Sequence, residues 1–179
     1  FNVLGSNLLP GGVGYNGHFE VLKTYLSRDY LWNSVRQMGG AYGCFVQFSQ
    51  ITGNIAFVSY RDPQVKKTYD AYLQVPEVVK SLDISDQVLQ QLVIGTYGNL
   101  IPHQSPAARG ATARNEYLSG ITTESKVQRI SDVLRTTPED LRSFAAPFAS
   151  MATRNCRTTI GNRKRIETDS SLFYVLTEI

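Results

Sequence analysis

The sequence is poor in histidine, the side chain that most often binds metals in proteins. His18 and His103 are the only two among 179 residues, and neither lies in a His-x-x-Glu-His or His-Glu-x-x-His arrangement. Because a catalytic zinc ion normally takes three protein ligands, we expect no metal site in this chain. His18 is expected to be a surface or capping residue, and His103 to face solvent.

Cysteines and long apolar runs are also rare. Cys44 and Cys156 lie far apart in strand-like, apolar surroundings, which favours two buried free thiols in a reducing compartment over a disulfide. No apolar run reaches membrane-spanning length, so no membrane partner is expected. The free thiols suggest an intracellular protein, in the cytosol or in a mitochondrial or other organelle matrix. The start at Phe1, without an initiator Met or a leader sequence, suggests a piece of a longer protein.

The net charge is only +3, but the basic residues are unevenly placed. Five of them, and no acidic residue, fall between Arg154 and Arg165. Such a run can bind nucleic acid, but no aromatic residue is interleaved to stack on bases. A solvated edge, or a positive wall facing peptide, is therefore the preferred interpretation, and no nucleic-acid partner is expected.

Length and periodicity predict one α+β domain over residues 1–179, with an antiparallel sheet and helices packed on one face. Residues 41–60 alternate with period two around a turn at Thr52-Gly53-Asn54, which predicts a β-hairpin. Short strands are expected near Phe1–Leu4 and Cys156–Ile160. About four strands are visible in all, fewer than the mean of about five to six strands in a sheet.

Helical spacing of apolar residues predicts most of the remaining chain to be helical. Phe19, Leu22 and Leu26 mark a first helix, with a break at Ser27-Arg28-Asp29 before a second. A third helix is expected to start at Asp62-Pro63, and a fourth to start after Asp83 or Ser85 and end at Gly98. After an exposed loop at 99–110, a fifth helix is expected to end at Gly120. A sixth is expected after Thr122 or Thr123, with Val127, Ile130 and Leu134 on one face, and a seventh after Thr137, with Leu141, Phe144 and Phe148 buried. An apolar tail from Leu172 to Ile179 is expected to dock on the domain or on a neighbour.

The stretch from Leu31 to Gly43 combines a cation, a phenol and two glycines. Arg36 falls in the last turn of the predicted helix, where the carbonyl end of the helix dipole favours a cation. Gly39 and Gly40 then end the helix, and at least one is expected to have a positive φ. Tyr42 follows at the start of the extended run. The two glycines therefore form a predicted hinge between Arg36 and Tyr42.

This stretch, Leu-Trp-x-x-Val-Arg-x-x-Gly-Gly-Ala-Tyr-Gly, resembles the presequence-protease branch of the pitrilysin/insulinase family. These are zinc peptidases with an inverted His-x-x-Glu-His motif. Further resemblance covers nearly the whole chain and is weakest after Thr159; it is carried by Ser59-Tyr60-Arg61-Asp62-Pro63, Ile94-Gly95-Thr96-Tyr97-Gly98-Asn99, Arg109-Gly110 and Tyr117-Leu118-Ser119-Gly120-Ile121-Thr122. It implies a pitrilysin/mitochondrial-processing-peptidase-like domain, the last of four, in the half that does not hold zinc, so that this chain alone would not be the hydrolase. Since the family's domain has further strands upstream of Phe1, it also implies that the domain is N-terminally incomplete, with an unpaired edge strand.

The resemblance also implies a function. The chain would be the C-terminal part of a zinc metalloendopeptidase that degrades unstructured peptides in a closed chamber, with zinc held outside this chain and the upstream domains and the peptide as partners. Arg36 and Tyr42 match the positions from which the family reaches the substrate. The alternative is a structural, non-catalytic peptidase-like domain that acts in assembly or interaction. From the residues alone, an arginine at a helix end and a tyrosine in a core are more often structural than functional.

Overall fold

A four-stranded antiparallel sheet is the centre of the computed structural model, which describes residues 1–8, 16–153 and 156–177. The strands are β1 (Asn2–Asn7), β2 (Gly43–Phe48), β3 (Asn54–Tyr60) and β4 (Cys156–Thr159). Their order is β2-β3-β1-β4. The predicted α+β class and the hairpin are therefore confirmed, and β4 is an edge strand that pairs with β1 from the far end of the sequence.

Hairpin register decides which side chains reach the core. Gly43 lies opposite Tyr60 and Phe48 opposite Ile55, and the turn between the strands contains Gly53, with φ of +70°. Since alternate residues point to opposite faces of a sheet, Val46 and Phe57 share the buried face with Leu4 of β1.

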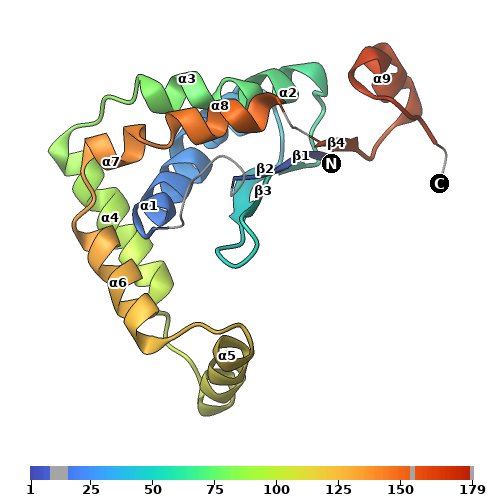
Figure 1. Ribbon diagram of the computed structural model, residues 1–179. Helices are drawn as coiled ribbons and strands as arrows, with labels where there is room; N and C mark the ends of the chain where they lie inside the picture. The colour runs from blue at the N-terminus through green and yellow to red at the C-terminus, as the bar shows by residue number, and fades with distance from the viewer. Residues whose placement is uncertain (9–15, 154–155, 178–179) are drawn as a thin grey trace.

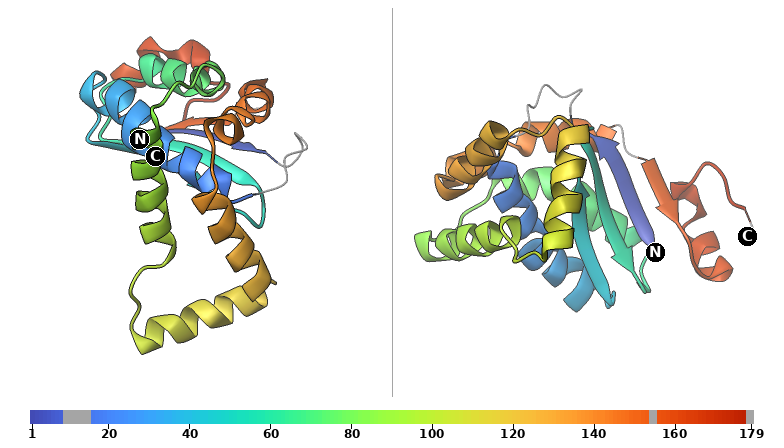
Figure 2. Two further views of the ribbon diagram at one scale, coloured as in Figure 1. Left: turned by 90° about the vertical axis from the view of Figure 1, so that its left-hand side faces the viewer. Right: turned by 90° about the horizontal axis from the view of Figure 1, so that it is seen from below.

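Helices from several parts of the chain cover that face (Figures 1 and 2). The helices of the described residues are α1 (His18–Tyr25), α2 (Lys66–Leu73), α3 (Val75–Lys80), α4 (Asp86–Leu100), α5 (Pro106–Leu118), α6 (Thr123–Leu134), α7 (Pro138–Arg142), α8 (Ala145–Thr153) and α9 (Arg163–Thr168), with π-helical turns η2 (Leu26–Tyr30) and η3 (Trp32–Gln37) and a 3₁₀ turn η4 (Ser170–Leu172); of these, α5 and α9 lie away from the sheet face. Helices α4 and α6 extend away from the sheet side by side, and α5 joins their far ends (Figure 2, left). At the other end of the molecule, α9 lies beyond β4 (Figure 1).

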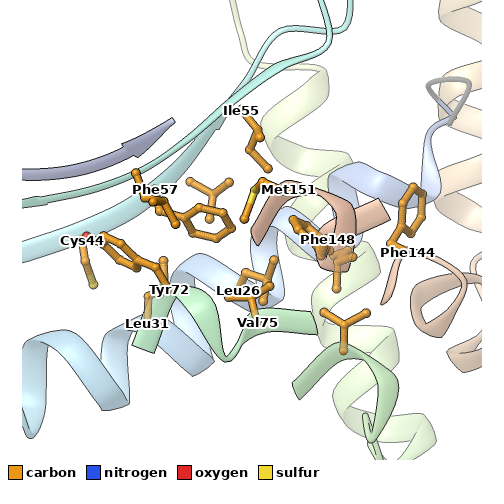
Figure 3. Packing of buried hydrophobic residues seen from close by; sticks show 14 of the residues in the cluster. Leu26, Leu31, Cys44, Ile55, Phe57, Tyr72, Val75, Phe144, Phe148 and Met151 are labelled. Carbon is orange, nitrogen blue, oxygen red and sulfur yellow. The ribbon is translucent and has the colours of Figure 1, made fainter. Parts of the chain in front are cut away.

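Aromatic side chains from the sheet and from helices distant in sequence meet in the core (Figure 3). Phe57 of β3 packs against Tyr72 of α2 and Phe148 of α8, at ring-centroid distances of 5.5 and 6.1 Å. Phe19 of α1 contacts Phe144 at 5.2 Å. Full burial of such side chains stabilises a fold by about 1.5–3 kcal/mol each, so these contacts fix α1, α2 and α8 against the sheet.

The predicted helix break at Ser27-Arg28-Asp29 is wrong. The helix continues from α1 through η2 and η3 to Gln37: no glycine or proline interrupts it, and its packing against β2 stabilises it. Leu26 and Leu31 are both fully buried, five residues apart, a spacing that a π-helical turn brings onto one face. Ser27 contributes instead to the sheet, since its hydroxyl accepts a hydrogen bond of 3.1 Å from the N–H of Val46.

Two predicted helix boundaries are also wrong. Asp62 does not cap a helix, because α2 begins only at Lys66, after Val65. Gly98 does not end α4, which continues to Leu100, as an isolated glycine is tolerated inside a helix at a cost of about 1 kcal/mol. The expected loop at 99–110 is shorter than predicted, since Ser105 caps α5 and its hydroxyl accepts a hydrogen bond from the N–H of Ala108. The caps at Ser85, Thr122 and Thr137 are confirmed.

Burial differs from the prediction at several apolar positions. Cys44 is buried, but Cys156 is exposed, because the face of β4 that carries it is not covered by helices. On α6 the buried residue is Val133, while Val127 and Leu134 are exposed. In the C-terminal tail, Leu172 and Phe173 pack on the core, whereas Tyr174, Val175 and Leu176 do not dock on the described part of the domain and are exposed; the last two residues of the predicted tail lie outside the described ranges.

Candidate functional site

The predicted site lies where the long N-terminal helix ends and turns into β2. Gly40 has a φ of +82°, so one of the two glycines has the left-handed conformation that the sequence predicts. Its N–H donates to the carbonyl oxygen of Arg36 at 2.9 Å, and the N–H of Ala41 donates to that of Val35 at 3.2 Å. These bonds satisfy two carbonyl groups that a helix end otherwise leaves open.

Gly39 is constrained differently. A Cβ atom at this position would lie 2.4 Å from the carbonyl oxygen of Val35, far inside any normal contact, although the φ of Gly39 is not positive. One glycine is thus required by its backbone conformation and the other by the close approach of the preceding turn.

Arg36 is fixed across this turn by two contacts. Its guanidinium carbon lies 3.7 Å from the ring centroid of Trp32, one helical turn earlier, and its Nε donates a hydrogen bond of 2.9 Å to the carbonyl oxygen of Tyr42. No carboxylate in the described ranges lies within ion-pair distance of it. The side chain is therefore oriented, but its charge is not neutralised by a neighbour among these residues.

Tyr42 immediately precedes β2 and is 59% exposed. Its N–H donates to the carbonyl oxygens of Tyr60 and Arg61 at 3.2 and 3.3 Å, and its ring contacts the Tyr60 ring edge-to-face at 5.5 Å. Its hydroxyl makes no hydrogen bond to any residue that the structure describes. The ring is supported while the phenolic oxygen stays available, so this tyrosine is not the buried core residue that a purely structural role would favour.

An open depression of about 490 Å³ brings the predicted residues together. It is lined by Arg36, Gln37, Gly40, Ala41, Tyr42 and Arg61. Arg61 lines this depression too, although it is not among the predicted site residues: its guanidinium carbon lies 5.2 Å from the centroid of the Tyr42 ring. Its place in the family-like segment from Ser59 to Pro63 was the signal that could have identified it.

The chemistry available at this depression is hydrogen-bond donation. A guanidinium and a neutral phenol both donate. Cys44, a candidate nucleophile near the turn, is a buried residue of β2. Burial, with a smaller effect of the Asp62 charge, raises the pKa of its thiol to about 11. Because the thiolate is the reactive form, Cys44 is suited to packing and not to attack on a substrate.

The described residues do not suit a zinc ion. Within residues 1–8, 16–153 and 156–177, no group of three or more His, Cys, Asp or Glu side chains could hold a metal. His18 has its Nδ1 3.0 Å from the hydroxyl of Thr136 and 3.8 Å from a carboxylate oxygen of Asp140, and His103 is exposed on the loop before α5. That the chain binds no metal stays a prediction.

The basic C-terminal segment is engaged in local contacts. Arg163 donates to the carboxylate of Glu167 at 2.7 Å, and Arg165 to the carbonyl oxygen of Pro63 at 2.7 Å. The first basic residue of the predicted run, Arg154, lies outside the described residues. Among the helices that the structure describes, none combines the length and apolar character needed to cross a membrane.

Curated relatives match this chain over most of its length. Protein HypA of Clostridium perfringens (strain 13 / Type A) is 31% identical over 169 residues, which are 94% of this chain and 17% of that protein. Presequence protease 1, chloroplastic/mitochondrial, of Arabidopsis thaliana is 29% identical over 161 residues, which are 90% of this chain and 15% of that protein. The chain thus spans about one sixth of the length of these relatives.

A solved structure and a family model agree with these matches. The crystal structure of a candidate zinc protease from Bordetella pertussis Tohama I superposes with a TM-score of 0.61 at 14% identity, covering 89% of this chain and 93% of that one, which shows a shared fold. The model of the PreP C-terminal domain matches residues 3–160. On this evidence the chain belongs to the family of presequence protease (PreP) C-terminal domains, as its resemblance predicts.

Proposed function

We propose that this chain is the C-terminal, substrate-binding domain of a zinc metalloendopeptidase that degrades unstructured peptides in a closed chamber. The observation that carries the proposal is the Arg36–Tyr42 turn. A guanidinium without a carboxylate partner in the described residues and a phenol without a hydrogen-bond partner there line one open depression. Relatives that carry the name presequence protease support the peptide as the substrate class.

In this function Arg36 and Tyr42 bind the peptide backbone. The free N–H groups of the Arg36 guanidinium and the Tyr42 hydroxyl donate to carbonyl oxygens of the substrate, including the oxygen that gains negative charge as the scissile bond is attacked. A donor aimed at developing charge binds the transition state more tightly than the ground state, and removing one such donor typically lowers kcat by about 10²–10³. The stacked Trp32 and the bond to the Tyr42 carbonyl keep the guanidinium oriented before substrate arrives.

The zinc ion of the parent enzyme belongs, in this proposal, to its upstream domains, because the described residues offer no ligand set. Those domains are the second partner of this chain, and no nucleic acid or membrane partner is proposed. The names of six relatives include mitochondrial, and one of these also includes chloroplastic; we accordingly propose an organelle matrix or the cytosol as the location.

Steady-state kinetics of the full-length parent test the proposal. Y42F removes the hydroxyl and keeps the ring, and R36K keeps the charge but loses the planar fork. We expect each to lower kcat by about 10²–10³ with little change in KM. Y117F and R109K are matched controls, since both wild-type side chains are exposed on α5, away from the depression, and should leave kcat unchanged.

Two results would count against the proposal. If Y42F and R36K fold normally and retain wild-type kcat and kcat/KM, the turn is structural and the alternative of a non-catalytic, peptidase-like domain holds. The 179-residue chain alone should also show neither bound zinc nor chelator-sensitive cleavage of a quenched peptide. Stoichiometric zinc with such cleavage would place the hydrolase in this chain and contradict its assignment as a substrate-binding part.

A further inference from the structure

Arg61 has an unusual backbone conformation. Its φ is +48°, and it is the one non-glycine residue with a positive φ among residues 1–8, 16–153 and 156–177. The left-handed region is unfavourable for a residue with a Cβ, by roughly 1–2 kcal/mol. Such strain persists only where the surrounding structure fixes it, and it is concentrated at functional sites.

The following residue, Asp62, fixes this turn. One of its carboxylate oxygens accepts hydrogen bonds from the side chains of Asn2, Ser59 and Thr68 at 2.9, 2.6 and 2.7 Å, and the other accepts one from the N–H of Gln64 at 2.8 Å. Asn2, Ser59 and Thr68 are each no more than 2% exposed. Three hydrogen bonds from buried side chains and one from a backbone N–H therefore hold the backbone on the C-terminal side of Arg61.

The strained conformation delivers two contacts to Tyr42. The carbonyl oxygen of Arg61 accepts a hydrogen bond of 3.3 Å from the N–H of Tyr42, and the guanidinium carbon lies 5.2 Å from the centroid of the Tyr42 ring. Tyr60 also contacts this ring, edge-to-face. No carboxylate in the described part of the chain forms an ion pair with Arg61. The cation–π contact is thus the interaction that this side chain makes in the structure.

We propose that Arg61 is a positioning residue for Tyr42: its strained backbone is retained because it sets the guanidinium against the phenol ring that donates to the substrate. The proposal rests on the proposed function of Tyr42. Glycine would suit a φ of +48° without strain, so what arginine adds at this position is the guanidinium and its contact with the ring.

Two variants of the full-length parent separate the guanidinium from the backbone. R61G removes both the guanidinium and the strain, and R61Q removes the guanidinium while leaving a Cβ in the left-handed conformation. We expect both to lower kcat about two- to fivefold, the effect of a cation–π contact at an exposed site, with KM unchanged. The melting temperature should fall slightly for R61Q, which loses the contact and keeps the strain, and change little for R61G, in which the loss of the contact is offset by release of the strain. Loss of activity in R61G alone would assign the effect to the backbone and overturn the proposal.

A double-mutant cycle tests whether Arg61 acts through Tyr42. In a Y42F background the ring carries no hydroxyl to position, so adding R61G should not lower kcat further; an equal loss in both backgrounds would mean that Arg61 acts on substrate directly, against the proposal. If Y42F alone keeps wild-type kcat, the proposed function fails. The contact between Arg61 and the Tyr42 ring is then tested by the ¹⁹F NMR spectrum of the parent labelled with 3-fluorotyrosine. The resonance of Tyr42 is identified as the one that is absent in Y42F. R61Q should shift this resonance, and an unshifted resonance overturns the positioning role.

Discussion

Replacement of Gly40 by alanine changes the stability of the turn in a direction that the structure fixes. At a φ of +82° a Cβ costs about 1–2 kcal/mol, and the lower entropy of the unfolded chain returns about 0.4–1 kcal/mol. The new Cβ would lie 3.4 Å from Cγ of Pro63, a tight contact but not a prohibitive one. We therefore expect G40A to lose about 1 kcal/mol, and G40V to lose more because a branched side chain tolerates this region poorly.

The assay is thermal unfolding of the 179-residue chain, followed by circular dichroism. For a protein of this size a loss of 1 kcal/mol lowers Tm by about 2–4 °C. G110A is the matched control: Gly110 is inside the exposed helix α5, with no atom within 4 Å of an added Cβ, so alanine should raise stability by about 0.5–1 kcal/mol. The two alanines are thus predicted to move Tm in opposite directions.

The reasoning is refuted if G40A raises Tm as G110A does, or if G40V leaves Tm unchanged. G39A provides an independent comparison, because its Cβ would meet the carbonyl oxygen of Val35 at 2.4 Å and overpacking of this kind typically costs about 1–3 kcal/mol. In the full-length parent, G40V should also reduce activity if the glycines act as the predicted hinge for Arg36 and Tyr42.

Two further predictions concern side chains outside the depression. Partial burial opposes ionisation of Asp140, but hydrogen bonds from the N–H and hydroxyl of Thr137 keep its pKa below the ordinary value; the stabilisation is therefore present at neutral pH and lost as pH falls through the folded-state pKa. Urea unfolding should show D140N to be about 1 kcal/mol less stable than wild type at pH 7, with a difference that disappears in acid. The exposed control D83N should be as stable as wild type at both pH values. A loss of stability in D140N that does not depend on pH would contradict this. Iodoacetamide at pH 8 should modify exposed Cys156 and spare buried Cys44, whose thiol pKa is raised to about 11; rapid modification of Cys44 by mass spectrometry would contradict its burial.

Local signals in the sequence predicted the elements that local physics determines. The alternation in residues 41–60, the hydroxyl caps at Ser85, Thr122 and Thr137, and the need for a left-handed glycine at the end of the helix all depend on neighbours a few residues away. These are confirmed.

Tertiary contacts explain the errors. Asp62 is a good helix cap by its residue type, yet its carboxylate accepts hydrogen bonds from Asn2 of β1, Ser59 of β3 and Thr68 of α2. The continuous helix through Ser27 depends on its packing against β2, which no local pattern encodes. The burial of Val133 rather than Leu134 likewise depends on how α6 packs against α1 and α4, which are distant in sequence.

For the predicted site, the structure shows which residues come together, while their role in binding stays a prediction. Arg36, Gly40 and Tyr42 line the depression together, as their spacing around one turn requires. Arg61 reaches it because the hairpin returns β3 beside Tyr42, and its positive φ is set by Asp62. A residue placed by strand pairing and strained by its neighbour gives no periodic signal in the sequence.

The most direct measurement of the central claim is the structure of the full-length parent with a peptide bound in its closed form. The account predicts that the Tyr42 hydroxyl and the Arg36 guanidinium lie within hydrogen-bond distance of carbonyl oxygens of the peptide, about 2.7–3.2 Å, at or beside the scissile bond. A peptide seated in the chamber with both side chains remote from its backbone would contradict the assignment of this turn as the substrate-binding site.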